Sequence, residues 1–155
     1  MARVTSDDEH VAAVRVDIVR SGGTRRLCVR LPDDDELASR LESGTTESIG
    51  VSGGDIVRVI VNRQTRYARI EADSRGRVLR GLFDNRRLVR TPGEGKDRLR
   101  EWLGEHDREE GDVLLLDVVV SGDAYGLRLP GDRTVYDVDA DPRGSLADIA
   151  RDLDG

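Results

Sequence analysis

The feature that most constrains the fold of this chain is a series of landmarks that occurs twice in the same order. Each series contains a basic segment ended by proline, two leucines four residues apart, a Gly-Asp pair before an apolar segment, and a tyrosine. The first series is Arg26–Pro32, Leu37, Leu41, Gly54, Asp55 and Tyr67, and the second is Arg86–Pro92, Leu99, Leu103, Gly111, Asp112 and Tyr125. The two series lie roughly 60 residues apart, which is typical of duplication followed by divergence. The alternative is chance, because Gly, Asp and Pro are common turn residues.

Short apolar segments between turn residues predict strands. Residues 11–19 and 26–31 alternate on either side of the turn at 21–24, which predicts a hairpin. The other expected strands are 56–61, 67–70, 78–83, 87–91, 113–120, 125–129 and 134–138. Short helices are expected around Leu37 and Leu41, where acidic residues precede the leucine pair, and at 97–106.

We therefore expect one mainly β domain with short α-helices, built as a pseudo-twofold barrel from two tandem strand–helix–strand–hairpin units. The units span about residues 14–72 and 77–130 within a single domain over residues 11–140, because one unit alone could not bury its apolar face. Residues 1–10 are polar and are expected to form a disordered tail. Residues 141–155 are expected to form a short C-terminal helix.

This pattern resembles that of a known group of DNA-binding proteins. The chain resembles the AbrB/SpoVT-like swapped-hairpin regulators in three motifs. These are a basic strand that ends in Leu31-Pro32 or Thr91-Pro92, a short helix with leucines spaced by four, and the sequence Gly-Asp-x-Val that begins at residue 54. With two units in one chain, residues 14–130 are similar to the DNA-binding pseudobarrels of plant transcription factors and restriction-enzyme effector domains, and to other cradle-loop barrels. The resemblance implies a barrel that binds DNA. The loops from proline to helix are more acidic here than in the bacterial regulators, which argues against DNA contact by these loops. The group also includes protein-interaction domains and enzymes, so the fold alone does not choose the function.

The charge composition is unusual in kind. Acidic residues number 31 and basic residues 25, giving a net charge of −6, and Lys96 is the only lysine. An acidic surface almost without lysine resembles the proteins of halophilic archaea, in whose salty cytoplasm screening limits self-repulsion. The alternative is a GC-rich genome that favours arginine codons. We expect a protein of a halophilic archaeon.

Basic residues concentrate in the middle of the chain. Residues 56–100 carry thirteen basic and five acidic residues, whereas residues 101–155 carry five basic and fifteen acidic residues. Arginine suits bidentate contacts to phosphates and guanine edges. This pattern predicts a protein that binds double-stranded DNA through arginines on strands and hairpin loops, in a regulatory or chromatin-associated role. The expected contact residues are Arg25, Arg26, Arg63, Arg66, Arg75, Arg77, Arg86 and Arg87. The alternative is a protein-interaction adaptor with an acidic contact surface, in which the arginines pair internally.

No residue pattern predicts catalysis. His10 and His106 are the only histidines, and neither has a partner in a recognisable motif. The segment 91–96 lacks the upstream glycine and the Ser/Thr of a phosphate loop, and the aspartates over 137–148 have Pro142 where a calcium loop needs glycine. We therefore expect no enzyme activity, no cofactor and no metal.

Two further observations bear on location. Cys28 is the only cysteine, which excludes an intrachain disulfide framework. No apolar run approaches the roughly 20 residues of a membrane span, and residues 1–10 lack a signal-peptide core. The expectation is a cytoplasmic monomer or homodimer.

Overall fold

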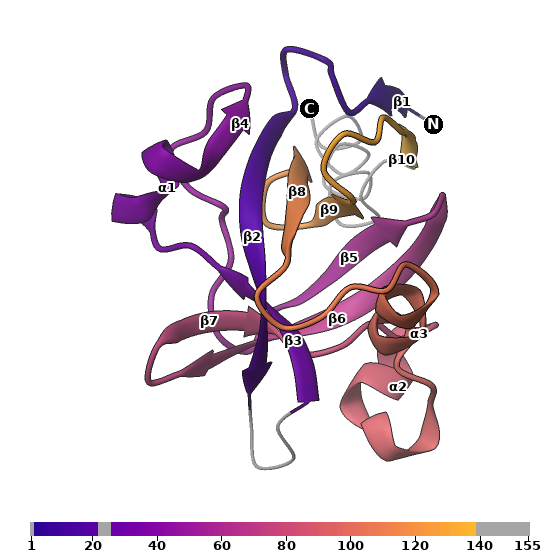
Figure 1. Cartoon of the computed structure of the whole chain (residues 1–155). Helices are drawn as coiled ribbons and strands as arrows, with labels where there is room; N and C mark the ends of the chain where they lie inside the picture. Colours follow the sequence, from indigo (N-terminus) through magenta and orange to yellow (C-terminus); the bar gives the residue numbers. More distant parts are fainter. Residues whose placement is uncertain (1, 22–25, 139–155) are drawn as a thin grey trace, which may run out of the picture.

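The computed structural model describes residues 2–21 and 26–138 (Figure 1). Within these residues the strands are β1 Ala2–Thr5, β2 Ala12–Ser21, β3 Arg26–Leu31, β4 Leu41–Ser43, β5 Ile56–Val61, β6 Gln64–Asp73, β7 Gly76–Leu79, β8 Val113–Val120, β9 Ala124–Arg128 and β10 Val135–Val138. The helices are α1 Asp34–Arg40, α2 Arg86–Arg90 and α3 Arg98–Glu105, with a 3-10 turn, η1, at Pro92–Glu94. No helix in this part of the chain has the length and apolar character that crossing a bilayer requires.

Seven strands close into a barrel. Their order around the ring is β2-β3-β7-β6-β5-β9-β8 and back to β2, and the short β4 pairs with β2 as an additional strand. Neighbours in the ring are antiparallel except β5 and β9, which are parallel. An odd number of strands cannot alternate in direction all the way around a ring, so at least one parallel pair is required. The expectation of a mainly β barrel with short helices is confirmed.

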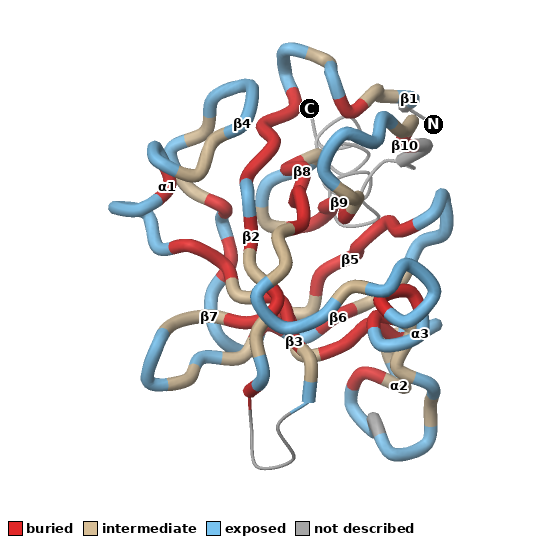
Figure 2. The backbone as a smooth tube through the Cα atoms, in the orientation of Figure 1, coloured by how far each residue is buried: buried red, intermediate tan, exposed pale blue. Residues whose placement is uncertain are grey.

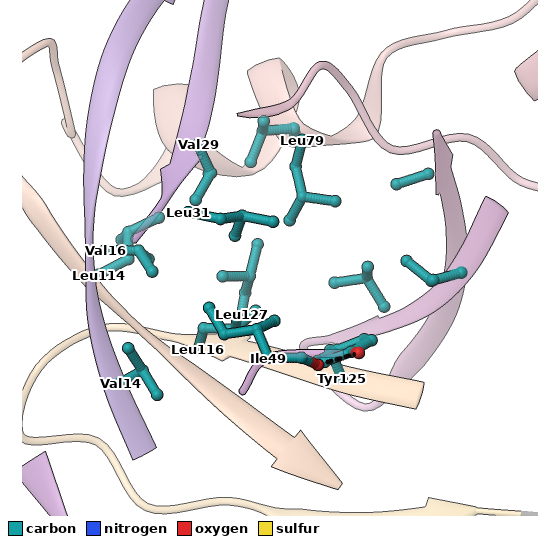
Figure 3. Packing of buried hydrophobic residues seen from close by; sticks show 14 of the residues in the cluster. Val14, Val16, Val29, Leu31, Ile49, Leu79, Leu114, Leu116, Tyr125 and Leu127 are labelled. Carbon is teal, nitrogen blue, oxygen red and sulfur yellow. Dashed lines mark hydrogen bonds between the residues drawn. The ribbon is translucent and has the colours of Figure 1, made fainter. Parts of the chain in front are cut away.

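The core lies inside the barrel and follows the period-two alternation of the strands. Val14, Val16 and Ile18 of β2 are fully buried, whereas Arg15 between them is exposed. Figure 2 shows buried residues along the strands and exposed residues at hairpin ends and on the helices. At the β9 side of the core, the Tyr125 hydroxyl donates a hydrogen bond to the carbonyl of Ile49 at 2.5 Å (Figure 3), which fastens the loop after β4 to the barrel.

The N-terminal residues differ from the expected disordered tail. β1 pairs with β10 in an antiparallel ribbon with Ala2 opposite Val138. The amide of Ser6 donates to the carbonyl of Thr134 at 2.9 Å, and Ser6 is buried. Backbone hydrogen bonds to a strand at the other end of the chain hold this segment, and a polar local sequence gives no sign of them. The expected C-terminal helix at 141–155 lies outside the described residues.

The predicted strand at 87–91 is wrong, because these residues form α2. The Asn85 side chain accepts a hydrogen bond from the amide of Leu88 at 2.9 Å and so caps the helix N-terminus. Arginine and leucine favour helix over strand, and Val89 on the inner side of α2 is buried. A five-residue alternating segment does not distinguish one helical turn from a strand.

The Gly-Asp landmarks behave more alike. Gly54 and Gly111 have positive φ angles of 98° and 95°. Their amides donate to the carbonyls of Ile70 and Ile18 at 2.7 and 2.9 Å, respectively. The glycine amide before β5 is therefore bound to β6 in the same way as the glycine amide before β8 is bound to β2. The two series still differ in their first element, which is a strand in the first series and a helix in the second.

Candidate nucleic-acid interface

The described members of the predicted arginine set do not share one surface. Arg26, Arg63 and Arg75 are exposed at the ends of the β2–β3, β5–β6 and β6–β7 hairpins. These hairpin ends point in different directions (Figure 1). Arg25 lies outside the described residues. The hairpin arginines therefore cannot contact one short duplex segment together.

The other four predicted arginines contact groups of the protein itself. Arg66 forms an ion pair with Asp84, and Arg87 forms one with Glu94 at 2.8 Å. Arg77 donates to the carbonyls of Val51 and Pro32 at 2.5 and 3.0 Å, which ties two loops to one end of the barrel. The Arg86 guanidinium lies over the Tyr67 ring, 5.1 Å from its centroid, as a cation–π contact.

Internal ion pairs also occupy arginines outside the predicted set. Arg58 and Asp123 form a buried pair between β5 and the β8–β9 turn, with Nη2 and Oδ2 2.7 Å apart. Arg128 pairs with Asp117 at 2.8 Å, and burial raises the pKa of Asp117 even though Arg128 donates hydrogen bonds to it. Arg58 and Asp123 lie 65 residues apart in the sequence, whereas Arg128 and Asp117 face each other across the β8–β9 hairpin. The internal-pairing alternative therefore describes a large share of the described arginines.

Less buried carboxylates also form ion pairs with arginines. Arg30 donates to Asp73 and lowers the pKa of that carboxyl to about 2, with the amide of Arg75 also donating. The Arg98 guanidinium donates to Asp84 at 2.9 Å and lowers its pKa. Each such carboxylate offsets one positive charge of the surface available to a polyanion, and Asp84 is shared between Arg66 and Arg98.

Besides the hairpin ends, the outer face of β6 carries arginines that these ion pairs leave available. Ala68 and Ile70 of β6 point into the core, so Tyr67 and Arg69 point outward. Arg69 is exposed and forms no ion pair with any described residue. Arg80, which follows β7, lines the same surface and contacts Glu71. Two cations and one carboxylate therefore meet over the middle of β6.

Helix α2 extends this surface. It lies against β6, where Arg86 covers Tyr67. Arg90 is four residues after Arg86, on the same side of the helix, and is exposed without an ion pair among the described residues. We call the surface formed by Tyr67, Arg69, Arg80, Arg86 and Arg90 the β6 face.

The middle of the β6 face is hollowed. An open depression of about 780 Å³ is lined by Gly53, Gly54, Arg69, Glu71 and Arg80, among others. Its glycine wall is formed by the Gly-Asp turn before β5, where no side chain limits close approach. A wide depression of this kind admits a polymer backbone more readily than it encloses a small molecule.

Only Arg86 of the β6 face belongs to the predicted set. Arg69, Arg80 and Arg90 were missed because the sequence does not show which arginines form ion pairs in the folded chain and which stay available. The alternation of Tyr67 and Arg69 against Ala68 and Ile70 is the sequence signal that could have placed Arg69 on an outer face.

One acidic cluster is close enough to share a cation. Asp33, Asp35 and Glu36 at the start of α1 are exposed, with ligand oxygens within 4.8 Å of one another. Asp33 and Glu36 also form the capping box of α1, which accounts for acids at these positions. Exposed carboxylates favour a helix N-terminus without a metal, so the cluster is explained by helix capping.

Comparison with known protein families gives a match over nearly the whole chain. The model of DUF7112, a family of unknown function, matches residues 1–153. No curated protein and no solved structure matches the chain.

Proposed function

Because the chain belongs to the DUF7112 family, whose function is unknown, we propose its function from its own surface: binding of double-stranded DNA through the β6 face. The observation that carries this proposal is the pair of exposed arginines, Arg69 and Arg90, which form no ion pair with any described residue. Many other described arginines are neutralised by the ion pairs above. Arg63 and Arg75 are also exposed, but at hairpin ends that point in different directions, whereas the β6 face brings Arg69 and Arg90 together with Arg80 and Arg86.

The chemistry of the β6 face suits a phosphate backbone. Each guanidinium can donate two parallel hydrogen bonds to one phosphate. Arg86, held over Tyr67, is oriented before any ligand arrives, so less side-chain entropy is lost on binding. Glu71 reduces the net charge of the depression by one, but it also fixes Arg80 at the rim. The sequence resemblance to DNA-binding pseudobarrels favours the same ligand.

The setting we propose is the salt-rich cytoplasm of a halophilic archaeon, where the protein acts as a regulatory or chromatin-associated factor. The supporting observations are the excess of acidic residues and the single lysine. In molar salt the Debye length is near 3 Å, so long-range attraction to DNA is weak. Binding then depends on direct arginine contacts and on the shape of the depression.

The test is a titration of the protein with a fluorescently labelled DNA duplex at several KCl concentrations. Arg69→Glu/Arg90→Glu reverses two charges on the β6 face, and Arg63→Glu/Arg75→Glu makes the same charge change at two hairpin ends. We expect the first variant to weaken binding by about 10-fold or more and to reduce the slope of log K against log salt by about 2, because each phosphate contact contributes close to one unit. The second variant should bind nearly as the parent does.

The outcomes separate the alternatives. Loss of binding only in Arg63→Glu/Arg75→Glu would move the DNA contact to the hairpin ends and contradict the β6 face. Absence of any duplex binding by the parent protein would contradict the DNA function itself.

A protein-interaction adaptor is the second candidate, and the internal pairing of the arginines favours it. An adaptor of this kind would use exposed acids such as Asp34 and Asp35 of α1, which form no ion pair among the described residues. In that case the partner surface would be basic, and Asp34→Asn/Asp35→Asn would weaken its capture while leaving the DNA titration unchanged.

A further inference from the structure

A second hollow lies away from the β6 face, beside the two-residue turn that joins β5 to β6. Val61 pairs with Gln64, so Asn62 and Arg63 are the only loop residues. Both have positive φ angles, 52° and 65°, as a type I′ turn requires. Asparagine suits the first position, but the second normally holds glycine, because a side chain there crowds the backbone. Arg63 is therefore held in a conformation that its residue type disfavours.

Backbone strain of this kind concentrates at functional sites, where the surrounding structure maintains it. The Arg63 side chain is exposed and forms no ion pair with any described residue. It lines a cavity of about 280 Å³ whose other walls come from the end of α3, from β9 and from the loop before β10. The turn thus has arginine at a position that favours glycine, and the arginine adds a guanidinium group to the lining of this cavity.

The floor of the cavity is apolar and aromatic. Ile60 and Leu127 contribute aliphatic surface, and Trp102, His106 and Tyr136 contribute rings. The Trp102 and His106 rings meet edge to face, with centroids 5.5 Å apart and an interplanar angle of 68°. Trp102 is mostly buried and His106 is exposed, so the two rings extend from the core to the surface. We call this cavity the Trp102 pocket.

The rim of the Trp102 pocket is basic. Three arginines line it, Arg63, Arg128 and Arg133, against the single carboxylate of Asp132. Arg128 is bound to Asp117, and Arg133 forms an ion pair with Asp7 at 3.2 Å. Arg63 is the one of these three that no described carboxylate neutralises, so it is the group available to an incoming anion.

We propose that the Trp102 pocket binds a small aromatic anion of the nucleoside monophosphate class. The aromatic ring packs on Trp102 and His106, and the phosphate accepts hydrogen bonds from Arg63. The volume of about 280 Å³ is slightly below the roughly 300–1,000 Å³ that is typical of small-molecule sites, which suits a single nucleotide and is too small for a dinucleotide. The pocket shares no lining residue with the β6 face as defined, so its occupancy does not depend on the proposed DNA binding.

The chain offers its own probe, because Trp102 is the only tryptophan. Adenosine monophosphate is titrated into the protein while tryptophan fluorescence is excited at the red edge of its absorption, with calorimetry as a second readout. Parallel titrations use adenosine and inorganic phosphate. We expect a saturable change with adenosine monophosphate, and at least 10-fold weaker binding of adenosine and of phosphate, since each lacks one half of the recognised group.

The decisive variant is Arg63→Gly. Glycine adopts positive φ freely, so the turn is kept while the guanidinium is removed. We expect at least 10-fold weaker binding of adenosine monophosphate, together with unchanged or higher thermal stability and unchanged duplex binding. Arg75→Gly removes a guanidinium from another exposed turn and should bind adenosine monophosphate as the parent does.

Three results would overturn the proposal. They are no saturable response to adenosine monophosphate at millimolar concentration, equal affinity for adenosine and its monophosphate, and parental affinity in Arg63→Gly. None of them bears on the β6 face, which the duplex titration tests separately.

Discussion

At the scale of single residues, Arg63 links backbone strain to stability as well as to binding. A non-glycine residue in the left-handed region costs about 1–2 kcal/mol. Arg63→Gly relieves this cost, although glycine loses more backbone freedom on folding and part of the gain is cancelled. We therefore predict that Arg63→Gly raises the free energy of unfolding by about 1 kcal/mol, measured by urea denaturation. A destabilised variant would show that the Arg63 side chain makes compensating contacts in the folded state.

The Asp73 carboxylate gives a residue-scale prediction about pH. It accepts hydrogen bonds from Arg30, from the amide of Arg75 and from the Ser21 hydroxyl, and its pKa falls from 3.8 to about 2. A lowered pKa in the folded state means that the ionised carboxylate stabilises the fold above the unfolded-state value, and that this contribution disappears as pH falls through the folded-state value.

Asp73→Asn should therefore be less stable than the parent at pH 5 and above. The difference in unfolding free energy should shrink between about pH 4 and pH 2, where Asp73 becomes protonated. Urea denaturation at several pH values measures it, and Glu94→Gln, in an exposed pair with Arg87, serves as the control. A difference that stays constant over this pH range would mean that Asp73 contributes by packing and not by charge.

At the scale of elements, the docking of β10 depends on a glycine in β9. A Cβ atom built on Gly126 would lie 2.2 Å from the Tyr136 ring, so only glycine leaves room for this ring. Tyr136 is buried, and its hydroxyl donates to Asp117 of β8. Burial raises the pKa of Tyr136, which keeps the hydroxyl protonated as a donor. The Tyr136 side chain thus connects β10 to both β8 and β9.

We predict that Gly126→Ala lowers the free energy of unfolding by about 1–3 kcal/mol, the usual cost of overpacking a core site. Tyr136→Leu removes the clashing ring end, so the double variant should lose less than the sum of the two single changes. A double-mutant cycle by urea denaturation measures this coupling. Additive effects would show that the Tyr136 ring is not what Gly126 accommodates.

The element scale also shows what sequence could predict. β2, β3, β5, β6, β8 and β9 were all expected, because their alternation spans several residues between clear turn signals. α2 and β1 were not, since capping by Asn85 and pairing with β10 decide them. Tyr67 and Tyr125 were read as equivalent, yet Tyr125 is in the core and Tyr67 lies under Arg86. Their spacings from Asp55 and Asp112 differ by one residue, and one residue moves a strand side chain to the opposite face.

The candidate site was less predictable than the fold for a related reason. The excess of arginine over residues 56–100 is visible in the sequence, but pairing is not. Arg58 reaches Asp123, and Arg66 reaches Asp84, across contacts that exist only after the barrel closes. Counting charges along the chain therefore locates a basic segment. Which of its arginines lack an ion pair is known only from the positions of the carboxylates in the folded structure.

At the scale of the whole molecule, two electrostatic effects oppose each other as salt rises. The net charge of −6 gives self-repulsion, which salt screens and which therefore weakens. Salt also weakens exposed ion pairs such as Arg87–Glu94, but it screens buried pairs such as Arg58–Asp123 much less. Exposed pairs contribute little to stability individually, so relief of repulsion should dominate.

We predict that the free energy of unfolding rises with KCl concentration. Most of the rise should come below about 1 M, because the Debye length shortens from about 10 Å at 0.1 M to about 3 Å at 1 M and screening is then nearly complete. Urea denaturation in a KCl series measures the rise, and Asp34→Asn/Asp35→Asn, with two fewer exposed charges, should show a smaller one. A fall in stability with salt would mean that the arginine–carboxylate pairs, and not the excess of acid, dominate the electrostatics of this barrel.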